Sequence, residues 1–263
     1  YTLSDSAGRS ITHEYVVRTG KYMIDWNIIM NGADKLLTNG ALNMTWHESP
    51  TRHQASIDYE KQLSNICFSV NNEFDYISSK TEATFEGPAQ WVGAVQQFFN
   101  TTLIAKNSFS SGSVKWARRV DSSNTLSDVD VTLQMKLPAT ASVTVPLQLY
   151  YGPNDYKILT TAAPEMDKIV NLGRDLYSFV RPINKYIIMP VFNFFASFIN
   201  SYGWVIALLT LLIRGVTSPL TYKSYLSGAK MRVLRPELDE LKKKFGSDQQ
   251  GFAAEQMKLF REA

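Results

Sequence analysis

Residues 203–220 read GWVIALLTLLIRGVTSPL, and this stretch decides how the rest of the chain is organised. It is apolar enough to enter a lipid bilayer, yet it carries Arg214 near its middle. An ionisable residue inside a membrane segment is costly, so by default it marks a functional position. The sequence before this stretch predicts a β-rich domain, and the sequence after it predicts a short, basic helical segment.

We place one transmembrane helix at residues 203–222. Aromatic side chains flank it, as they do at the two interfaces of a bilayer; they are Tyr202, Trp204, Tyr222 and Tyr225. Within the span, polar residues recur at spacings of four and three, so they share one helical face. This polar stripe consists of Thr210, Arg214, Thr217, Ser218 and Thr221.

The insertion energy of this span is close to balance. Its nine Leu, Ile and Val residues contribute roughly −3 to −5 kcal/mol in total, while a central arginine costs about 2.5 to 3.5 kcal/mol. Arg214 lies roughly 16 Å into a hydrocarbon core that is roughly 30 Å thick. The alternative, in which its side chain extends to an interface, is disfavoured by this depth. We therefore expect neighbouring helices or a water-filled cavity beside the stripe.

Residues 1–155 predict a mainly β domain, an antiparallel β-sandwich. Residues 129–135 alternate apolar and polar side chains, which is typical of a half-buried strand. Segment 90–99 fits a strand or a short helix, and both alternatives stay open. Other runs of aromatic and β-branched residues predict strands at 15–17, 22–30, 66–70, 103–105 and 143–151.

Residues 156–200 predict a helical connector to the span. Apolar residues approximate one face of a helix over 156–177, and Pro164 suits a helix start. Residues 186–199 have a wide apolar face and a narrow polar stripe, which predicts an amphipathic helix in the membrane interface. The side chains expected to face the lipid include Phe192, Phe195 and Phe198.

One long span is the alternative for this region, because no charge lies between Lys185 and Arg214. Pro190 and the sequence Asn-Ser-Tyr-Gly at 200–203 both interrupt a single helix. We therefore favour two separate elements, an interfacial helix and a transmembrane helix.

Residues 223–263 predict a helical hairpin. The first arm has a heptad-like apolar seam along 231–245, and the second has apolar side chains at Phe252, Met257 and Phe260. Between the arms, Gly246 fits a helix C-cap, and Ser247 or Asp248 fits the next N-cap.

Basic residues are concentrated in this hairpin, as they are on the cytoplasmic side of membrane proteins. Its outer face is either a docking surface, formed by Lys230, Arg232 and Arg235, or an ordinary solvated surface. Acidic residues at 237, 239 and 240 interrupt the basic run, so we do not expect a nucleic-acid partner.

The sequence offers little for catalysis or metal binding. Cys67 is the single cysteine, which excludes an intrachain disulfide, and we expect it to be a buried apolar residue. His47 and His53 lie with Glu48 in a predicted polar loop, at a spacing that fits no metal site. A phosphate-binding glycine loop and a nucleophile elbow are both absent. We therefore expect no metal, no cofactor and no enzymatic activity.

Several motifs resemble the YidC branch of the YidC/Oxa/Alb family of membrane-protein insertases. In and after the span they are Ile-Arg-Gly at 213–215, Ser-Pro-Leu-Thr at 218–221 and Ala-Lys-Met-Arg-Val-Leu-Arg-Pro at 229–236. In the β region they are Trp-Val at 91–92, Gln-Gln-Phe-Phe at 96–99 and Tyr-Gly-Pro at 151–153. Since the chain begins with Tyr1 and stops within a helical pattern, we expect it to be a fragment.

The resemblance implies a periplasmic β-supersandwich, an amphipathic helix at 177–200 and a hydrophilic groove that contains Arg214. The implied function is insertion and folding of inner-membrane proteins, alone or with the Sec translocon. The implied partners are nascent membrane proteins, membrane lipids, and ribosome or signal-recognition components at the hairpin. The implied location is the bacterial inner membrane, with the residues before the span in the periplasm and those after it in the cytoplasm.

Two other functions fit parts of the sequence. A single-pass receptor or scaffold would combine a β ectodomain with a cytoplasmic docking hairpin, and Arg214 would pair with an acidic residue of a partner span. A sugar-binding or sugar-isomerising β domain would need a cleft with paired His and carboxylate groups. For that cleft the sequence offers His47, Glu48 and His53.

Overall fold

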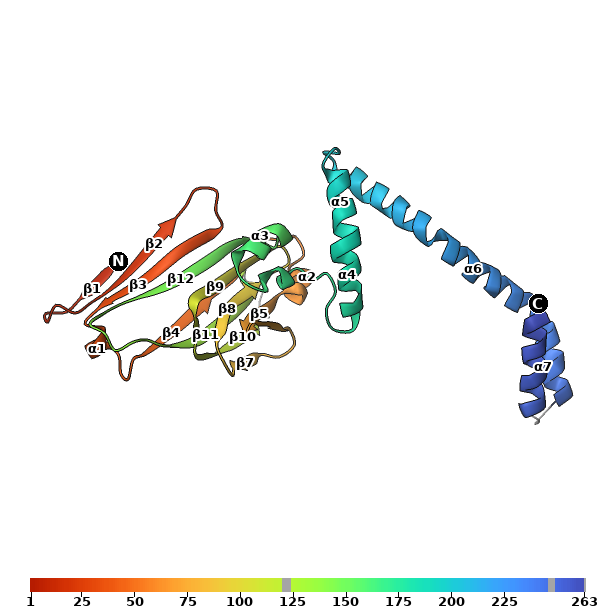
Figure 1. The fold of residues 1–263 in the computed structure, drawn as a ribbon, viewed down its shortest axis with the longest axis horizontal. Helices are drawn as coiled ribbons and strands as arrows, with labels where there is room; N and C mark the ends of the chain where they lie inside the picture. Colours follow the sequence, from red (N-terminus) through yellow and green to blue (C-terminus); the bar gives the residue numbers. More distant parts are fainter. Residues whose placement is uncertain (120–123, 246–248, 263) are drawn as a thin grey trace. The chain divides into compact units, whose positions relative to one another are not determined.

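The computed structural model describes residues 1–119, 124–245 and 249–262. The chain forms two compact units, Tyr1–Asn171 and Leu172–Ala263. The first unit contains all the described strands, and the second contains only helices among its described elements (Figure 1).

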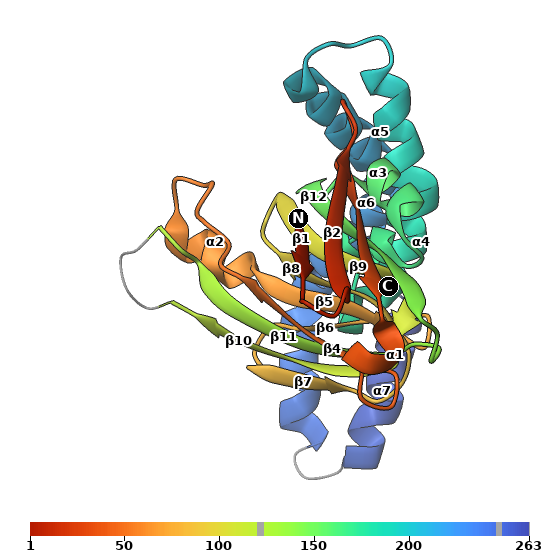
Figure 2. The ribbon, with the colours of Figure 1, turned by 90° about the vertical axis from the view of Figure 1, so that its left-hand side faces the viewer.

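The first unit is a sandwich of two antiparallel sheets, which Figure 2 shows as separate layers. The larger sheet has eight strands in the order β1-β2-β3-β12-β9-β8-β5-β6, and the smaller has four in the order β4-β11-β10-β7. This arrangement confirms the predicted antiparallel β-sandwich. The strands are β1 (Thr2–Ser4), β2 (Ser10–Val17), β3 (Met23–Asn31), β4 (Ala41–Glu48), β5 (Asn65–Val70), β6 (Glu73–Ile77), β7 (Glu82–Phe85), β8 (Ala89–Val95), β9 (Phe99–Phe109), β10 (Ser111–Arg118), β11 (Ser127–Lys136) and β12 (Ser142–Pro153).

The main hydrophobic core lies between the two sheets. In β11, alternate side chains from Val129 to Met135 are buried, and the side chains between them are more exposed. Strand β12 supplies a matching inward row, which includes Val145 and Leu147. The alternation predicted for residues 129–135 is therefore confirmed, because side chains on a strand point to the two faces in turn.

A second core covers the outer face of the larger sheet. Trp91 on β8 is fully buried there beside Cys67, and its indole Nε1 donates a hydrogen bond of 2.9 Å to the Pro164 carbonyl. Two short helices close this core with Leu159 and Met166. They are α3 (Tyr156–Ala162) and the 3-10 helix η1 (Met166–Ile169). Cys67 is thus a buried apolar residue, as predicted.

The structure resolves several alternatives left open by the sequence. Segment 90–99 is a strand followed by a turn, because β8 ends at Val95 and β9 begins at Phe99. The predicted helical region 156–177 is split into α3, η1 and the start of a second 3-10 helix, η2 (Asp175–Val180). The expectation that His47 and Glu48 lie in a loop is wrong, because they are the last two residues of β4.

The second unit begins with a helical run that leads to the membrane-type helix. After η2 come α4 (Arg181–Ile183), the π-helix η3 (Asn184–Ile188) and α5 (Met189–Ala196). Pro190 does not interrupt this run, contrary to expectation, because the wider π turn directly before it makes room for the proline ring.

The two remaining helices of the first unit are the short α1 (Ala33–Leu36) and α2 (Ile57–Leu63).

The longest helix, α6 (Tyr202–Phe245), has 44 residues. The break between Ala196 and Tyr202 confirms two elements rather than one long span. Helix α6 continues past the predicted span and through Pro219 and Pro236. At 1.5 Å per residue it is roughly 66 Å long, about twice the thickness of a hydrocarbon core.

The last helix, α7 (Gln249–Glu262), contacts α6 and completes the predicted hairpin. In the seam of α6, Leu234 is buried and Leu238 and Leu241 are half-buried, whereas Met231 is exposed. In α7, Phe252 and Leu259 are partly buried, whereas Met257 is exposed, so Met257 does not belong to the apolar stripe. The predicted caps at 246–248 and the side chain of Phe260 lie outside the described residues.

We expect Leu159→Ala to destabilise the first unit by about 2–5 kcal/mol, because the truncation leaves a cavity in the outer core. Unfolding of the full chain, followed by tryptophan fluorescence in denaturant, measures this change. Leu3→Ala is the matched control, since Leu3 on β1 is 76% exposed, and its effect should stay within about 0.5 kcal/mol. Equal stability of the two variants would contradict the role assigned to α3.

Candidate functional site

The candidate site of the second unit is the polar stripe on α6. Among the described helices, α6 alone is long and apolar enough to cross a membrane, and only 6% of its apolar window is buried by the rest of the chain. Large apolar side chains such as Leu211 and Leu220 are exposed along it. The apolar part of the helix is therefore exposed on nearly all sides to lipid, to water or to another protein.

The hydroxyl groups of the stripe are satisfied within the helix. Thr210 Oγ1 donates to the Ile206 carbonyl at 2.8 Å, Thr217 Oγ1 to the Ile213 carbonyl at 2.8 Å, and Thr221 Oγ1 to the Thr217 carbonyl at 2.9 Å. These bonds lower the cost of placing the hydroxyls in an apolar medium, because each donor has a partner.

Arg214 is different from its neighbours in the stripe. Its side chain is exposed, and it has no hydrogen-bond or ion-pair partner among the described residues. A guanidinium has five N–H donors and keeps its charge in proteins, so the helix backbone cannot satisfy it. Ser218 is also exposed on the same face. The structure thus places all five predicted stripe residues on one helix, with Arg214 as the group that needs an outside partner.

Pro219 adds a further polar group near the stripe. It has no N–H, so the carbonyl of Gly215, four residues earlier, loses its normal helix partner. Gly215 has no side chain, and a Cβ built there would meet nothing within 4 Å. A carbonyl that lacks its usual i+4 donor and a guanidinium are therefore on neighbouring residues in the middle of an apolar helix.

The predicted interfacial phenylalanines form an aromatic cluster at the C-terminal end of α5, where Phe198 lies in the turn that follows the helix. Phe195 and Phe198 meet edge to face at 6.1 Å, and Phe194 lies 5.2 Å from Phe198 between ring centroids. Phe192 stacks on Tyr202 at 6.2 Å, which ties α5 to the first residue of α6. Phe198 is 60% exposed, so part of the cluster is open to a lipid interface.

The predicted docking residues of the hairpin are also brought to the surface. Lys230, Arg232 and Arg235 are exposed on α6, on either side of the buried seam residue Leu234. Their contacts with a partner are not defined by this position alone, and they stay a prediction.

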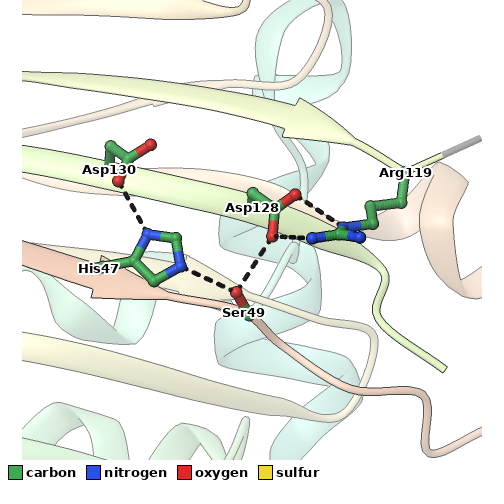
Figure 3. Close-up of polar contacts among 5 residues, drawn as sticks. All are labelled: His47, Ser49, Arg119, Asp128 and Asp130. Atoms are coloured by element: carbon green, nitrogen blue, oxygen red, sulfur yellow. Dashed lines mark hydrogen bonds and ion pairs between the residues drawn. The ribbon is translucent and has the colours of Figure 1, made fainter. Parts of the chain in front are cut away.

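A polar network in the first unit has the connectivity of a Ser-His-Asp triad (Figure 3). His47 Nδ1 lies 2.8 Å from Asp130 Oδ1, and Ser49 Oγ lies 3.1 Å from His47 Nε2. Ser49, however, donates its single proton to Asp128. Asp128 also accepts a hydrogen bond from Arg119, and this bond from Arg119 is the main reason that the pKa of Asp128 is lowered. The His47 and Asp130 side chains are 58% and 60% exposed. The network joins β4 to β11 and does not activate Ser49.

A cavity of about 340 Å³ lies at the end of β4, and it is lined by Glu48 and His53, two of the three residues that the sequence offered for a sugar-binding cleft. Glu48 lines it together with Thr101 on β9, whose hydroxyl favours the ionised form of the carboxyl and so lowers its pKa. The sequence contained a signal for this position. Every second residue of β4, namely Leu42, Met44 and Trp46, packs toward the core, and Glu48 is the next residue in that series. A carboxylate therefore occupies an inward-facing position.

Comparison with known proteins identifies the chain's relatives. Two protein-family models match it: the YidC periplasmic domain over residues 1–186, and the 60Kd inner membrane protein over residues 194–263. A sandwich domain joined to a membrane-competent helix thus defines an inner-membrane type of protein with a large domain outside the bilayer. The chain belongs to the YidC family.

Curated relatives carry the name "Membrane protein insertase YidC". One from Amoebophilus asiaticus is 30% identical over 94% of this chain and 42% of its own length. One from Parabacteroides distasonis is 26% identical over 92% of the chain and 40% of its own length, and one from Chloroherpeton thalassium is 26% identical over 100% and 46%. The chain therefore spans less than half the length of these relatives.

We expect Glu48→Gln to raise the unfolding temperature at pH 7 but not near pH 4. Burial raises the pKa of the Glu48 carboxyl, opposed in part by the Thr101 hydrogen bond and by the charge of His47. The folded state therefore favours the protonated form, and that stability is lost as pH rises from about 4.3 through the raised pKa.

Thermal unfolding across this pH range measures the difference between the variant and the unchanged chain. Glu73→Gln on β6 is the matched control, because Glu73 is exposed on the larger sheet. A difference that is the same at pH 4 and pH 7 would refute the assigned burial of Glu48.

Proposed function

We propose that α6 forms one wall of a hydrophilic groove through which the complete protein inserts other proteins into the inner membrane. The observation that carries this proposal is the polar stripe with an unpartnered Arg214 on an otherwise apolar, exposed helix. The names of the relatives, all membrane protein insertases, agree with it.

A groove requires further walls, and the relatives supply a reason to expect them. Each is more than twice as long as its match to this chain, which leaves ample sequence for other helices. A wet face with one fixed cation is more stable against such helices, with water between them, than against lipid.

The physical mechanism needs no covalent chemistry. Water in the groove lowers the barrier for moving a short polar tail of a client protein part of the way across the bilayer. The Arg214 guanidinium attracts acidic groups of that tail, and the low dielectric constant around the groove strengthens this attraction. The apolar segment of the client then moves out into lipid, driven by the burial of its own surface.

The other parts of the chain have supporting roles in this proposal. The aromatic cluster at the C-terminal end of α5 lies in the membrane interface, and the sandwich lies on the periplasmic side. The basic hairpin lies in the cytoplasm, where Lys230, Arg232 and Arg235 meet the ribosome or signal-recognition components. Nascent membrane proteins, lipids and the Sec translocon are the remaining proposed partners.

We expect Arg214→Glu to reduce insertion of a client with an acidic tail at least tenfold, because attraction becomes repulsion in a low-dielectric groove. Arg214→Lys should stay within about threefold, since the charge is kept. The measurement is protease protection of the client in liposomes that contain the complete product of the gene encoding this sequence.

Lys243→Glu is the matched control, because it reverses a positive charge on the same helix, outside the predicted span and away from the proposed docking residues. A client with a basic tail should reverse the effect of Arg214→Glu. Undiminished insertion by Arg214→Glu, or fixed crosslinks from Thr210 to one partner helix instead of to clients, would refute the groove and favour a scaffold.

A further inference from the structure

The cavity at the end of β4 lies entirely within the first unit and takes no part in the proposed groove. Its walls are formed by the end of β4 and the loop after it, by the β8–β9 turn and the start of β9, and by the end of β12. Its lining residues are Tyr22, Glu48, Ser49, Pro50, Thr51, His53, Gln96, Phe99, Asn100, Thr101, Tyr151 and Gly152.

The charge in this cavity is negative, and His47 compensates it only in part, because burial is the larger effect on the pKa of Glu48. Glu48 has no ion-pair partner among the described residues, and the Thr101 hydroxyl favours its ionised form. Burial raises the pKa of its carboxyl, so the ionised form at neutral pH is held at a cost in free energy. A cation that entered the cavity would recover part of this cost, because it restores the solvation that burial removed.

Aromatic rings surround the same space. Tyr22, Phe99 and Tyr151 are 48%, 41% and 62% exposed, although each is large enough to be buried. The His53 ring packs on Phe99 at 5.4 Å between centroids and holds that ring at the wall. Aromatic faces carry negative electrostatic potential, so a carboxylate among such rings is suited to an organic cation.

The buried amides of the cavity have part of their donor capacity taken up by the fold, and Glu48 is the one acid among the lining residues. Gln96 and Asn100 are 7% and 2% exposed, and each amide nitrogen already donates one hydrogen bond within the fold. Gln96 Nε2 donates to the Thr51 carbonyl at 2.7 Å, and Asn100 Nδ2 donates to Asn154 at 2.8 Å. A sugar needs both donors and acceptors from its site, whereas an ammonium group needs acceptors alone. The cavity offers the acceptors.

We propose that this cavity binds an alkylammonium group, with Glu48 as its counter-ion and the rings of Tyr22, Phe99 and Tyr151 around its alkyl chain. This chemistry has two sources, a lysine side chain of a polypeptide and a free polyamine. The site is independent of the proposed insertion function, because no residue of α6 contributes to it.

Isothermal titration calorimetry of the full 263-residue chain in lipid nanodiscs tests the proposal. The probes are N-acetyl-lysine methylamide, spermidine and the uncharged N-acetyl-norleucine methylamide. We expect saturable binding of a charged probe in the millimolar range and at least tenfold weaker binding of the norleucine probe. Tighter binding of the lysine probe assigns the source to a polypeptide, and tighter binding of spermidine assigns it to a polyamine.

Variants localise the effect to the cavity. Glu48→Gln keeps the shape of the side chain and should weaken binding at least fivefold, and Tyr151→Ala should weaken it about threefold. Glu73→Gln removes an exposed carboxylate of the same unit and should leave binding unchanged. Equal binding of the lysine and norleucine probes, full binding by Glu48→Gln, or binding of maltose in place of the cations would overturn the proposal.

Discussion

The Arg214 guanidinium must be solvated, and this requirement limits the surroundings in which α6 of the second unit can lie. Arginine stays charged at any pH that the protein meets, so α6 has no route to neutralise it. The threonine hydroxyls of the stripe donate hydrogen bonds to backbone carbonyls of the same helix. Arg214, in contrast, has no hydrogen-bond partner among the described residues. Wherever α6 lies, water or an acceptor must come to this face. The apolar surroundings set how strongly any such acceptor is held.

The first unit solves a different problem, which is how to bury both faces of one sheet. Its eight-stranded sheet packs on the smaller sheet at one face and on α3 and η1 at the other. Trp91 links the layers, because its ring fills the outer core while its N–H satisfies the carbonyl of Pro164 in the connection between the two helices. The helical segment after β12 is therefore part of the sandwich domain's stability and not a free connector.

The sequence predicted features that depend on local periodicity. Strand β11 and the stripe on α6 were both visible, because alternation and a spacing of three and four fix which side chains share a face. The split of 156–177 was not visible, since the side chains of Met166 and Ile169 are held by a distant sheet. The continuity of helix through Pro190 also depends on a π turn, which no residue pattern announces.

The cavity at Glu48 shows how far a binding site can be predicted from the sequence alone. Its residues come from β4, β8–β9 and β12, and only the folded sheets bring them together. The polar residues at 47–53 indicated a loop, and the inward parity of Glu48 after Trp46 was the one local signal against it. Exposed aromatic rings cannot be distinguished from core rings in a sequence. Sites built on long-range pairing therefore require the register of the strands.

The continuous helix α6 carries both Arg214 and the hairpin seam residue Leu234. Leu234, which is buried in the hairpin seam, lies 20 residues after Arg214, so at about 100° per residue the two side chains point in nearly opposite directions around the helix axis. Helix α7 therefore docks on the back of the same rod that carries the cation on its front. The seam that α7 covers and the face that carries the cation are therefore kept on opposite sides of one helix, so a partner could approach Arg214 without displacing α7.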